Sequence, residues 1–210
     1  MHAPTEDHWA AVKSILRYLQ ATSSYGLHIT WDSLFLHCFS DADWVDSIDD
    51  WKSTGDYLVH RGSTLISSKS RKQRTVARSS TEAEYKALAD GTAEILWIRS
   101  LLLELWLSSS SSTTLWCDNL EATFLSANPV FHVRTKHVEV DYHFIRDRVA
   151  KKEIQVRFIS SKDQLADVFT KPLPLVSFAS FRSKLQVESP PLAWRGILWK
   201  KGLYICKYLI

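Results

Sequence analysis

The stretch Arg78-Ser79-Ser80-Thr81-Glu82-Ala83-Glu84-Tyr85-Lys86-Ala87-Leu88-Ala89 begins the longest helical pattern in the chain. Serine and threonine directly before an apolar run are typical helix N-cap residues, and Ser79-x-x-Glu82 and Thr81-x-x-Glu84 both have the spacing of a capping box. One capping box needs only one glutamate. If Ser79 and Glu82 form it, Glu84 lies about one turn inside the helix without a capping role. A carboxylate at that place must be solvated, paired with a cation or bound to a metal.

The composition is that of a soluble globular protein. The chain has 210 residues, of which 45% are hydrophobic and 23% are charged, which suits either one medium-sized domain or a domain with appendages and argues against disorder. Cys38, Cys117 and Cys206 are scattered and form no C-x-x-C pair, so neither a disulfide framework nor a zinc ribbon is indicated. No signal peptide is recognisable, and no apolar run reaches the roughly 20 residues of a membrane span. We therefore expect an intracellular protein without a membrane partner.

Positive charge is concentrated just before the central helix. The formal net charge of +3 does not by itself indicate a polyanionic partner. Between Tyr57 and Thr81, however, the sequence has basic residues and no acidic one. Such a run forms either a solvated face or a surface that binds nucleic acid. Its members are Arg61, Lys69, Arg71, Lys72, Arg74 and Arg78.

Helical and strand patterns alternate along the chain. Helices are predicted where apolar residues recur every three or four positions, and strands where short apolar runs alternate or stop at turn residues. The tail after Val187 shows no clear periodicity. The expected helices cover residues 9–20, 80–106, 120–127, 137–149, 161–171 and 176–185, and the expected strands cover 27–31, 34–39, 56–62, 63–68, 114–117 and 154–159.

Local signals refine three of these predictions. The first two strands are expected to pair as a hairpin through Asp32-Ser33, and the next two as a hairpin with Gly62 near the turn. The capping box Ser161-x-x-Gln164 is expected to open a helix that ends near Lys171, because Pro172 follows.

Four acidic residues occupy comparable positions in these elements. Asp41 and Asp118 follow short apolar strands, and Glu84 and Asp167 lie early in two helices. Each alone has an ordinary explanation in turn or N-cap chemistry, but one end of a sheet flanked by helices would bring all of them together. Carboxylates at such short distances raise one another's pKa values and need cations nearby to stay ionised. Two Mg²⁺ ions about 4 Å apart meet that need and can hydrolyse a phosphodiester, with Mn²⁺ as the alternative ion.

Six motifs in order resemble one known family. Together they are similar to the ribonuclease H domain of copia-type retrotransposon Pol polyproteins, over roughly residues 9–185, and residues 9–26 resemble the connection between reverse transcriptase and ribonuclease H. The motifs are Ser40-Asp41-Ala42-Asp43-Trp44, Lys52-Ser53-Thr54, Ala77-Arg78-Ser79-Ser80-Thr81-Glu82-Ala83-Glu84-Tyr85, Trp116-Cys117-Asp118-Asn119, Arg134-Thr135-Lys136-His137-Val138-Glu139-Val140-Asp141-Tyr142-His143 and Gln164-Leu165-Ala166-Asp167-Val168-Phe169-Thr170-Lys171-Pro172-Leu173.

The resemblance implies a ribonuclease H-like α/β fold with a mixed five-stranded sheet and helices on both faces. It further implies a connection segment over residues 1–31, the ribonuclease H-like domain over 32–173, and a C-terminal helix with an irregular tail over 174–210. The chain would act beside the reverse transcriptase portion of the same polyprotein, in the cytoplasm or in a virus-like particle.

The resemblance also implies roles for the acidic residues. In that family the first Asp bridges both metal ions, which assigns this role to Asp41. Glu84 and Asp118 would complete the metal on the leaving-group side, and Asp167 the metal that positions the attacking water. The expected reaction is hydrolysis of the RNA strand of an RNA–DNA hybrid. The residues expected to contact its phosphate backbone are Lys69, Arg71, Lys72, Arg74 and Arg78.

Departures from the family leave a second function open. Gly55-Asp56 stands where related sequences commonly have Ser-Gly, Ser68 stands where Trp is common, and residues 159–163 lack the His found there in cellular ribonucleases H. A catalytically inactive, nucleic-acid-binding remnant is therefore the alternative. An integrase-like strand transferase is less favoured, because its Glu follows two Asp residues whereas Glu84 comes second.

Two further patterns have a structural and a functional interpretation. His137, Glu139, Asp141 and His143 would form a metal-binding face on a strand, but on the expected helix only residues four apart meet, so we favour a surface salt-bridge pattern. Cys38 lies in an apolar strand, and we predict a core residue instead of a nucleophile.

Overall fold

The computed structural model describes residues 3–30, 32–45, 50–107, 111–127, 136–171, 173–189 and 204–205. The chain forms two compact units, one of Thr30–Leu185 and one that combines Met1–Ile29 with Gln186–Ile210, and each is described by itself. The division into residues 1–31, 32–173 and 174–210 stays a prediction. Within the described ranges, no helix combines the length and the apolar character that crossing a membrane would take.

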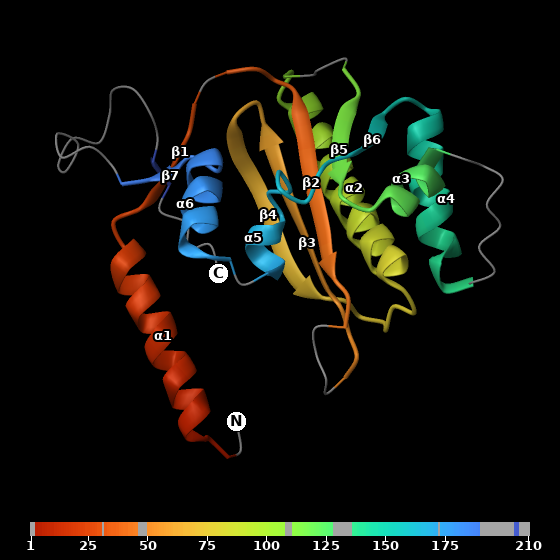
Figure 1. Cartoon of the computed structure of the whole chain (residues 1–210). Coiled ribbons are helices and arrows are strands. Elements are labelled where there is room, and N and C mark those ends of the chain that lie inside the picture. The colour runs from red at the N-terminus through yellow and green to blue at the C-terminus, as the bar shows by residue number, and fades with distance from the viewer. Residues whose placement is uncertain are drawn as a thin grey trace. The chain divides into compact units, whose positions relative to one another are not determined.

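A mixed sheet of five strands forms the centre of the unit Thr30–Leu185 (Figure 1). The strand order is β4-β3-β2-β5-β6, in which β4, β3 and β2 are antiparallel neighbours and β2, β5 and β6 run parallel. The predicted second hairpin is confirmed, and Gly62 at its turn has a φ of +58°. The strands are β2 (Leu36–Asp43), β3 (Thr54–Arg61), β4 (Thr64–Lys72), β5 (Thr113–Cys117) and β6 (Ile154–Phe158).

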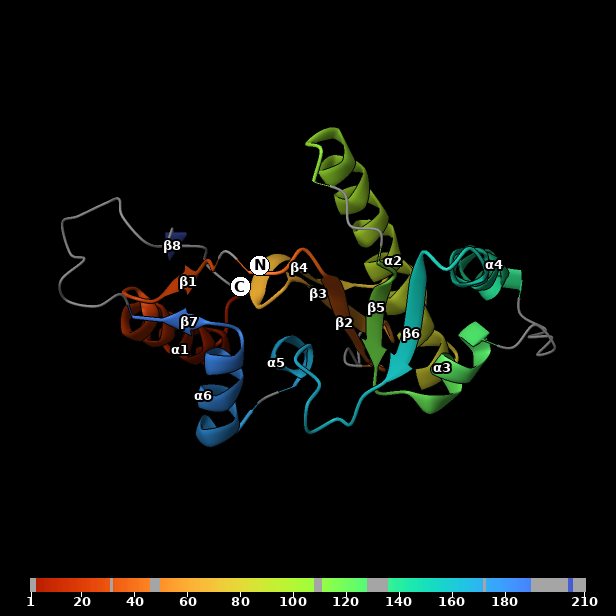
Figure 2. The same cartoon turned by 90° about the horizontal axis from the view of Figure 1, so that it is seen from above.

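Helices lie on both faces of this sheet (Figures 1 and 2). Cys38 of β2 faces α2, because a Cβ added at Gly91 of that helix would lie 3.0 Å from the Cys38 Sγ. Asp41 lies three residues further along the strand and therefore faces the opposite side, where Thr170 of α5 donates to its carboxylate. The helices of this unit are α2 (Ser80–Glu104), α3 (Leu120–Ala127), α4 (Lys136–Ala150), α5 (Asp167–Thr170) and α6 (Leu175–Lys184).

The hydrophobic core lies between the sheet and α2. Tyr85, Leu88 and Ile95 are fully buried, as the helical pattern predicts, and Tyr85 stacks on Tyr142 of α4 with ring centroids 4.2 Å apart. Cys38 is also fully buried, so its predicted core position is confirmed. The length of α2 follows from this wide apolar face, since burial stabilises each apolar side chain by roughly 1.5–3 kcal/mol.

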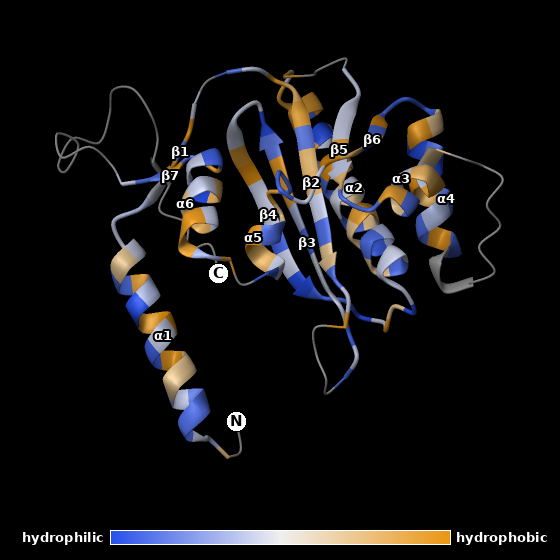
Figure 3. Cartoon of the chain, in the orientation of Figure 1, coloured by the Kyte–Doolittle hydropathy of each residue, from blue (hydrophilic) through white to orange (hydrophobic). Residues whose placement is uncertain are grey.

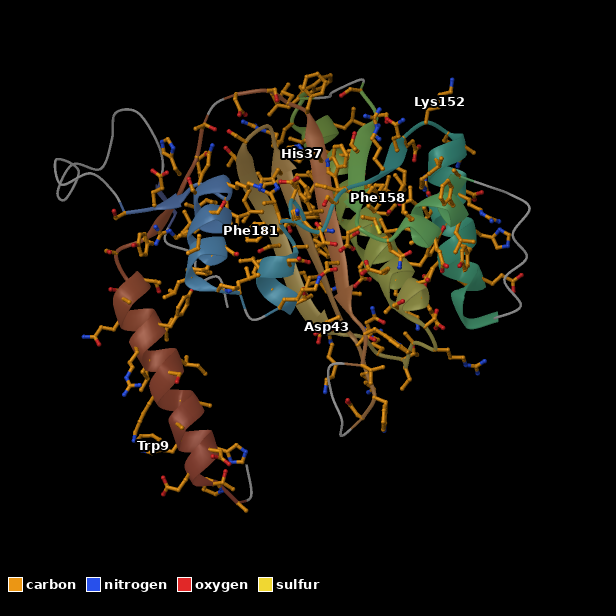
Figure 4. All side chains as sticks on the ribbon, in the orientation of Figure 1. Trp9, His37, Asp43, Lys152, Phe158 and Phe181 are labelled. Carbon is orange, nitrogen blue, oxygen red and sulfur yellow. The ribbon has the colours of Figure 1, made fainter. Side chains whose placement is uncertain are left out.

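The second unit contains α1 (Glu6–Thr22) and a small sheet of order β7-β1-β8. The predicted first helix is confirmed, and Thr5 caps it by accepting a hydrogen bond from the His8 N–H. Hydrophobic and hydrophilic residues are mixed along the whole of α1 (Figure 3), and Trp9 projects from its first half (Figure 4). The strands are β1 (Gly26–His28), β7 (Val187–Glu188) and β8 (Tyr204–Ile205).

The predicted hairpin through Asp32-Ser33 is wrong. β1 pairs with β7 and β8, and β2 pairs with β3 and β5. The Asp32 carboxylate instead accepts hydrogen bonds from the N–H of Ser63 (2.8 Å) and its hydroxyl (2.6 Å), which fixes this connection to the β3–β4 turn. An apolar pattern identifies a strand but not its partner, and here the partners are distant in sequence. Trp31, the predicted end of the first strand, lies outside the described residues, as does most of the tail.

A cluster of rings covers the sheet on the side that Asp41 faces. His37 and His60 stack with centroids 5.2 Å apart, and Phe39 meets His60 edge-on at 5.8 Å. His60 is 2% exposed, and neither of its ring nitrogens has a hydrogen-bond partner in the described structure. Burial therefore lowers the pKa of His60 to about 4.

Replacing His60 with Phe is expected to make the protein more resistant to acid. The unfolded chain binds this proton near the ordinary His pKa of 6.5, whereas the folded protein binds it only near 4, so stability falls as the pH drops through that window. The loss from this group is on the order of 3 kcal/mol, and phenylalanine removes it. Urea unfolding near neutral pH and near pH 4.5 measures the difference. His143→Phe is the control because that side chain is 70% exposed, and equal acid sensitivity in the parent and the His60 variant would contradict the prediction.

Candidate active site

Two of the predicted acidic residues meet because β2 and β5 are parallel neighbours. Ser40 pairs with Cys117, the last residue of β5, so Asp118 just beyond β5 comes to lie beside Asp41, which is still within β2 and does not follow the strand as the sequence pattern had predicted. Figure 4 marks the two ends of β2 with His37 and Asp43, and Asp41 lies close to the Asp43 end. Asn119 caps α3 by accepting a hydrogen bond from the Ala122 N–H (2.9 Å). Asp118 is therefore not the helix cap, which the sequence alone had left open.

The start of α2 separates the roles of its two glutamates. Ser79 caps α2 as predicted, since its Oγ accepts from the Glu82 N–H (3.1 Å), whereas the Glu82 side chain accepts from the N–H of Arg78 (3.0 Å), one residue before the N–H that a capping box uses. Glu84 is 6% exposed, and its Oε1 accepts from the Ala42 N–H of β2 (3.3 Å). The side chain of Glu84 thus reaches from the helix to the strand that carries Asp41.

Asp167 is placed by a segment that differs from the prediction. The expected helix over residues 161–171 is only the short α5, which begins at Asp167 and has no side-chain cap. Gln164 is fully buried and donates from Nε2 to the Ser40 carbonyl (2.8 Å) instead of closing a capping box. This long-range bond outweighs the local capping preference and fixes the segment beside Asp41. The predicted end near Lys171 is correct.

The four predicted acidic residues lie in two overlapping groups. Asp41, Asp118 and Asp167 each offer a carboxylate oxygen, and these oxygens lie within 4.8 Å of one another. Glu84 and Asp118 form a second group of the same compactness with the Cys117 thiol. Carboxylate oxygens are hard ligands that suit Mg²⁺ or Mn²⁺. The donor set fits the predicted metals, and the assignment of each residue as a ligand stays a prediction.

Burial and mutual repulsion raise the pKa values of these acids. Burial, with the nearby charges of Asp41 and Asp118, holds the pKa of Glu84 well above its usual range. Burial and the Asp41 charge also raise the pKa of Asp118, although a hydrogen bond from the Ser161 hydroxyl (2.9 Å) opposes the shift. The pKa of Asp167 rises to about 6, chiefly through burial. Such shifts are typical of functional sites in which several carboxyl groups are buried close together.

Two residues at this site were missed by the sequence analysis. The Thr170 hydroxyl donates to Asp41 Oδ2 (2.5 Å), and the Lys171 ammonium lies 2.6 Å from Asp167 Oδ1 and 3.6 Å from Asp41 Oδ2. Their positions three and four residues after Asp167 are the sequence signal, because side chains at that spacing meet on one helical turn.

Asp56, one of the departures from the family, adds a further carboxyl group nearby. It pairs with Asp41 across β2 and β3, so the two side chains share one face of the sheet. Asp56 is 1% exposed, and burial raises its pKa to about 7. A proton therefore neutralises this group more readily than an ordinary aspartate, which limits its repulsion of Asp41.

Four of the five residues predicted to contact nucleic acid lie together in the structure. Lys69, Arg71, Lys72 and Arg74 line one pocket of about 420 Å³ beside α2, and Arg78 is not among its lining residues. Lys69 and Lys72 already form ion pairs, with Asp90 at 2.8 Å and with Asp50 at 3.0 Å. Contact between this surface and nucleic acid stays a prediction.

The alternating residues of α4 form an ion pair, as predicted. His143 Nε2 lies 3.9 Å from Glu139 Oε1, and both side chains are exposed. Within the ranges that the structure describes, no compact group of possible metal ligands contains Glu139, Asp141 or His143. The side chain of His137 lies outside those ranges.

Comparison with known proteins places the chain in a family. It is 48% identical over 199 residues to the "Retrovirus-related Pol polyprotein from transposon RE2" of Arabidopsis thaliana, an alignment that covers 94% of this chain. The chain belongs to the retrovirus-related transposon Pol polyproteins. This Pol segment spans only 14% of the length of that relative. No family model matches the chain.

Solved structures share the fold of the Pol segment. The foamy viral protease-reverse transcriptase, solved in complex with an RNA/DNA hybrid, aligns over 68% of this chain and 20% of that chain, with a TM-score of 0.50 and 11% identity. The N-terminal RNase H domain of a Mycobacterium tuberculosis protein aligns over 72% of this chain and 98% of that chain, with a TM-score of 0.49 and 11% identity. With the strand order described above, the predicted ribonuclease H-like α/β fold of the Pol segment is confirmed.

Proposed function

We propose that this Pol segment is a ribonuclease H that hydrolyses the RNA strand of RNA–DNA hybrids with two Mg²⁺ ions, or Mn²⁺ in their place. The observation that carries the proposal is the convergence of Asp41, Asp118 and Asp167 within 4.8 Å, with Glu84 beside Asp118. A purely structural role does not account for so many buried acids at one point, because their repulsion destabilises the fold.

Each residue of the site has its own proposed role. Asp41 shares one compact group with Asp118 and Asp167 and is proposed to hold both ions, with Glu84 and Asp118 completing one ligand set and Asp167 the other. When bound, the two ions supply an activated water and stabilise the leaving oxygen. Gln164, Ser161 and Thr170 position the segment and the carboxylates through the hydrogen bonds described above.

The basic surface is proposed to bind the phosphate backbone of the hybrid. Lys69, Arg71, Lys72 and Arg74 share one pocket, and Arg78 precedes the cap of α2. Contacts of this kind position a duplex without reading its sequence, and preference for the RNA strand would come from its 2′-hydroxyl groups. The foamy viral relative in fold was solved with an RNA/DNA hybrid, which supports this choice of substrate.

The proposed setting follows from the relatives. Because the curated relative is a Pol polyprotein about seven times longer, we propose that the segment acts next to a reverse transcriptase portion of the same polyprotein. The proposed location is intracellular, in the cytoplasm or in a virus-like particle, and no membrane partner is proposed.

A cleavage assay tests the proposal. The chain is incubated with Mg²⁺ and an RNA strand labelled at one end and annealed to DNA, and a labelled DNA duplex serves as the control substrate. Cleavage of the RNA strand alone, abolished by a chelator, is the expected result. Hybrid binding without cleavage would instead support the inactive remnant, and cleavage of the DNA duplex would contradict the substrate assignment.

Neutralising the basic pocket is expected to weaken hybrid binding. In the double variant Arg71→Gln and Arg74→Gln, the dissociation constant should rise about tenfold and the slope of its salt dependence should fall by about two, because about 0.9 counter-ions are released per phosphate contact. Fluorescence anisotropy over a range of salt concentrations measures both. The matched control is Lys151→Gln with Lys152→Gln, which removes the same charge at the turn before β6, on the opposite edge of the sheet (Figure 4). Equal weakening by both pairs would contradict a specific basic site.

A further inference from the structure

Lys171 places a positive charge inside the proposed metal site. Its Nζ lies 2.6 Å from Asp167 Oδ1 and 3.6 Å from Asp41 Oδ2, and the oxygens of these two acids and of Asp118 form one compact group. The Asp41 side chain is only 1% exposed, whereas that of Lys171 is 42% exposed. The ammonium thus enters from the solvent side and reaches the most buried acid of the group.

The backbone holds Lys171 in this position. Its N–H donates to the Asp167 carbonyl (3.0 Å) and closes the single turn of α5, after which the backbone is extended, with φ −121° and ψ 139°. The residue before a proline favours that conformation, and Pro172 follows in the sequence. Thr170 donates to Asp41 from the same turn. The end of α5 therefore places both a hydrogen-bond donor, the Thr170 hydroxyl, and a positive charge, the Lys171 ammonium, beside Asp41.

We propose that the Lys171 ammonium is an internal counter-ion that occupies the place between Asp41 and Asp167 which a divalent cation takes in the active enzyme, so that metal binding must displace it. The proposal rests on the proposed two-metal site and adds a residue that sets how much metal the enzyme requires. An ammonium and a hydrated Mg²⁺ both seek carboxylate oxygens, and the two cannot lie together between oxygens this close. Lys171 then stabilises the fold without metal and weakens the binding of metal.

The proposal predicts tighter metal binding in Lys171→Met. Methionine keeps the length of the side chain and removes the charge, so Mn²⁺ should bind the substrate-free protein about tenfold more tightly, a factor that the loss of one well-placed ion pair supplies. Lys171→Arg restores a cation and should bind Mn²⁺ nearly as weakly as the parent. Electron paramagnetic resonance of free Mn²⁺ measures the affinity, and thermal melts in chelator establish that each variant is folded.

A matched control distinguishes the effect of Lys171 occupying the metal site from the general effect of removing one positive charge. Lys184 is 43% exposed and pairs with Asp163 at 3.1 Å, outside both groups of possible ligands, so Lys184→Met should leave the affinity for Mn²⁺ unchanged. The gain in Lys171→Met should also persist at about 1 M salt, where the screening length is about 3 Å and only direct contact survives.

The outcomes distinguish this proposal from the proposed function. Equal Mn²⁺ affinity in the parent and Lys171→Met, or a gain that disappears at high salt, overturns the role of Lys171 and leaves the metal site standing. Absence of Mn²⁺ binding in the parent and every variant overturns the metal site and this proposal with it. Because binding is measured without substrate, a catalytically inactive chain gives the same reading as an active one.

Discussion

Replacing Asp41 with Asn is expected to abolish hybrid cleavage while the protein stays folded. Asp41 belongs to the compact group of three acids, in which one of its carboxylate oxygens lies within 4.8 Å of an oxygen of both Asp118 and Asp167. Asparagine keeps the shape and can still accept the Thr170 hydrogen bond, but it removes the charge that would hold the ions. We expect the rate to fall on the order of 1,000-fold, as for the loss of one electrostatic stabiliser in an active site. Gel analysis of labelled RNA under single-turnover conditions measures the rate.

The control for Asp41 lies on the same strand. Asp43, labelled in Figure 4, is two residues further along β2 than Asp41, so both side chains share one face of the sheet. Asp43 belongs to neither compact group of possible metal ligands. Asp43→Asn should therefore cleave within a few-fold of the parent. Without metal, Asp41→Asn should melt within about 5 °C of the parent, since it removes a like charge from a buried group and, with it, the ion pair to Lys171. Cleavage that survives in Asp41→Asn would exclude the proposed site.

The sequence predicted the parts of this fold in which local pattern and burial agree. The long apolar face of α2 and the alternation of β6 are strong signals, and the structure has both elements within a few residues of the expected bounds. The capping argument at Ser79 also distinguished Glu82 from Glu84, because a capping box is a local interaction that depends only on spacing.

The remainder depends on contacts that no local pattern encodes. Thr170 and Asp41, which share a hydrogen bond, are 129 residues apart in the chain. Gln164 and Ser40, which share another, are 124 residues apart. Gln164 fits a capping box by spacing, yet its amide satisfies a buried carbonyl of β2, and leaving that carbonyl unpaired would cost about 1–3 kcal/mol. The sequence predicts that β1 is one strand of a local hairpin, yet it pairs with β7 and β8 from the far end of the chain. In each case a tertiary hydrogen bond outweighs a local preference.

The two glutamates at the start of α2 provide the second decisive experiment. Glu84→Gln is expected to abolish cleavage, whereas Glu82→Gln should leave the rate within a few-fold of the parent, although the residues are two positions apart on one helix turn. Glu84 is buried beside Asp118, and because burial raises its pKa and disfavours the charged form, a neutral amide of the same shape should leave the fold intact. The amide cannot become a charged ligand, and the loss of activity should be on the order of 100-fold or more.

Stability should change in the opposite sense in these two variants. Glu82 accepts from the Arg78 N–H and pairs with Lys86 at 2.7 Å, so Glu82→Gln should lower the free energy of unfolding by about 0.5–1 kcal/mol. Glu84→Gln should raise stability near neutral pH, because the unfolded chain ionises this carboxyl above about 4.5 while the folded protein resists doing so. Urea unfolding in chelator, beside cleavage in Mg²⁺, measures both effects. If instead Glu82→Gln stopped cleavage and Glu84→Gln only lowered stability, the cap and the ligand would have been assigned the wrong way round.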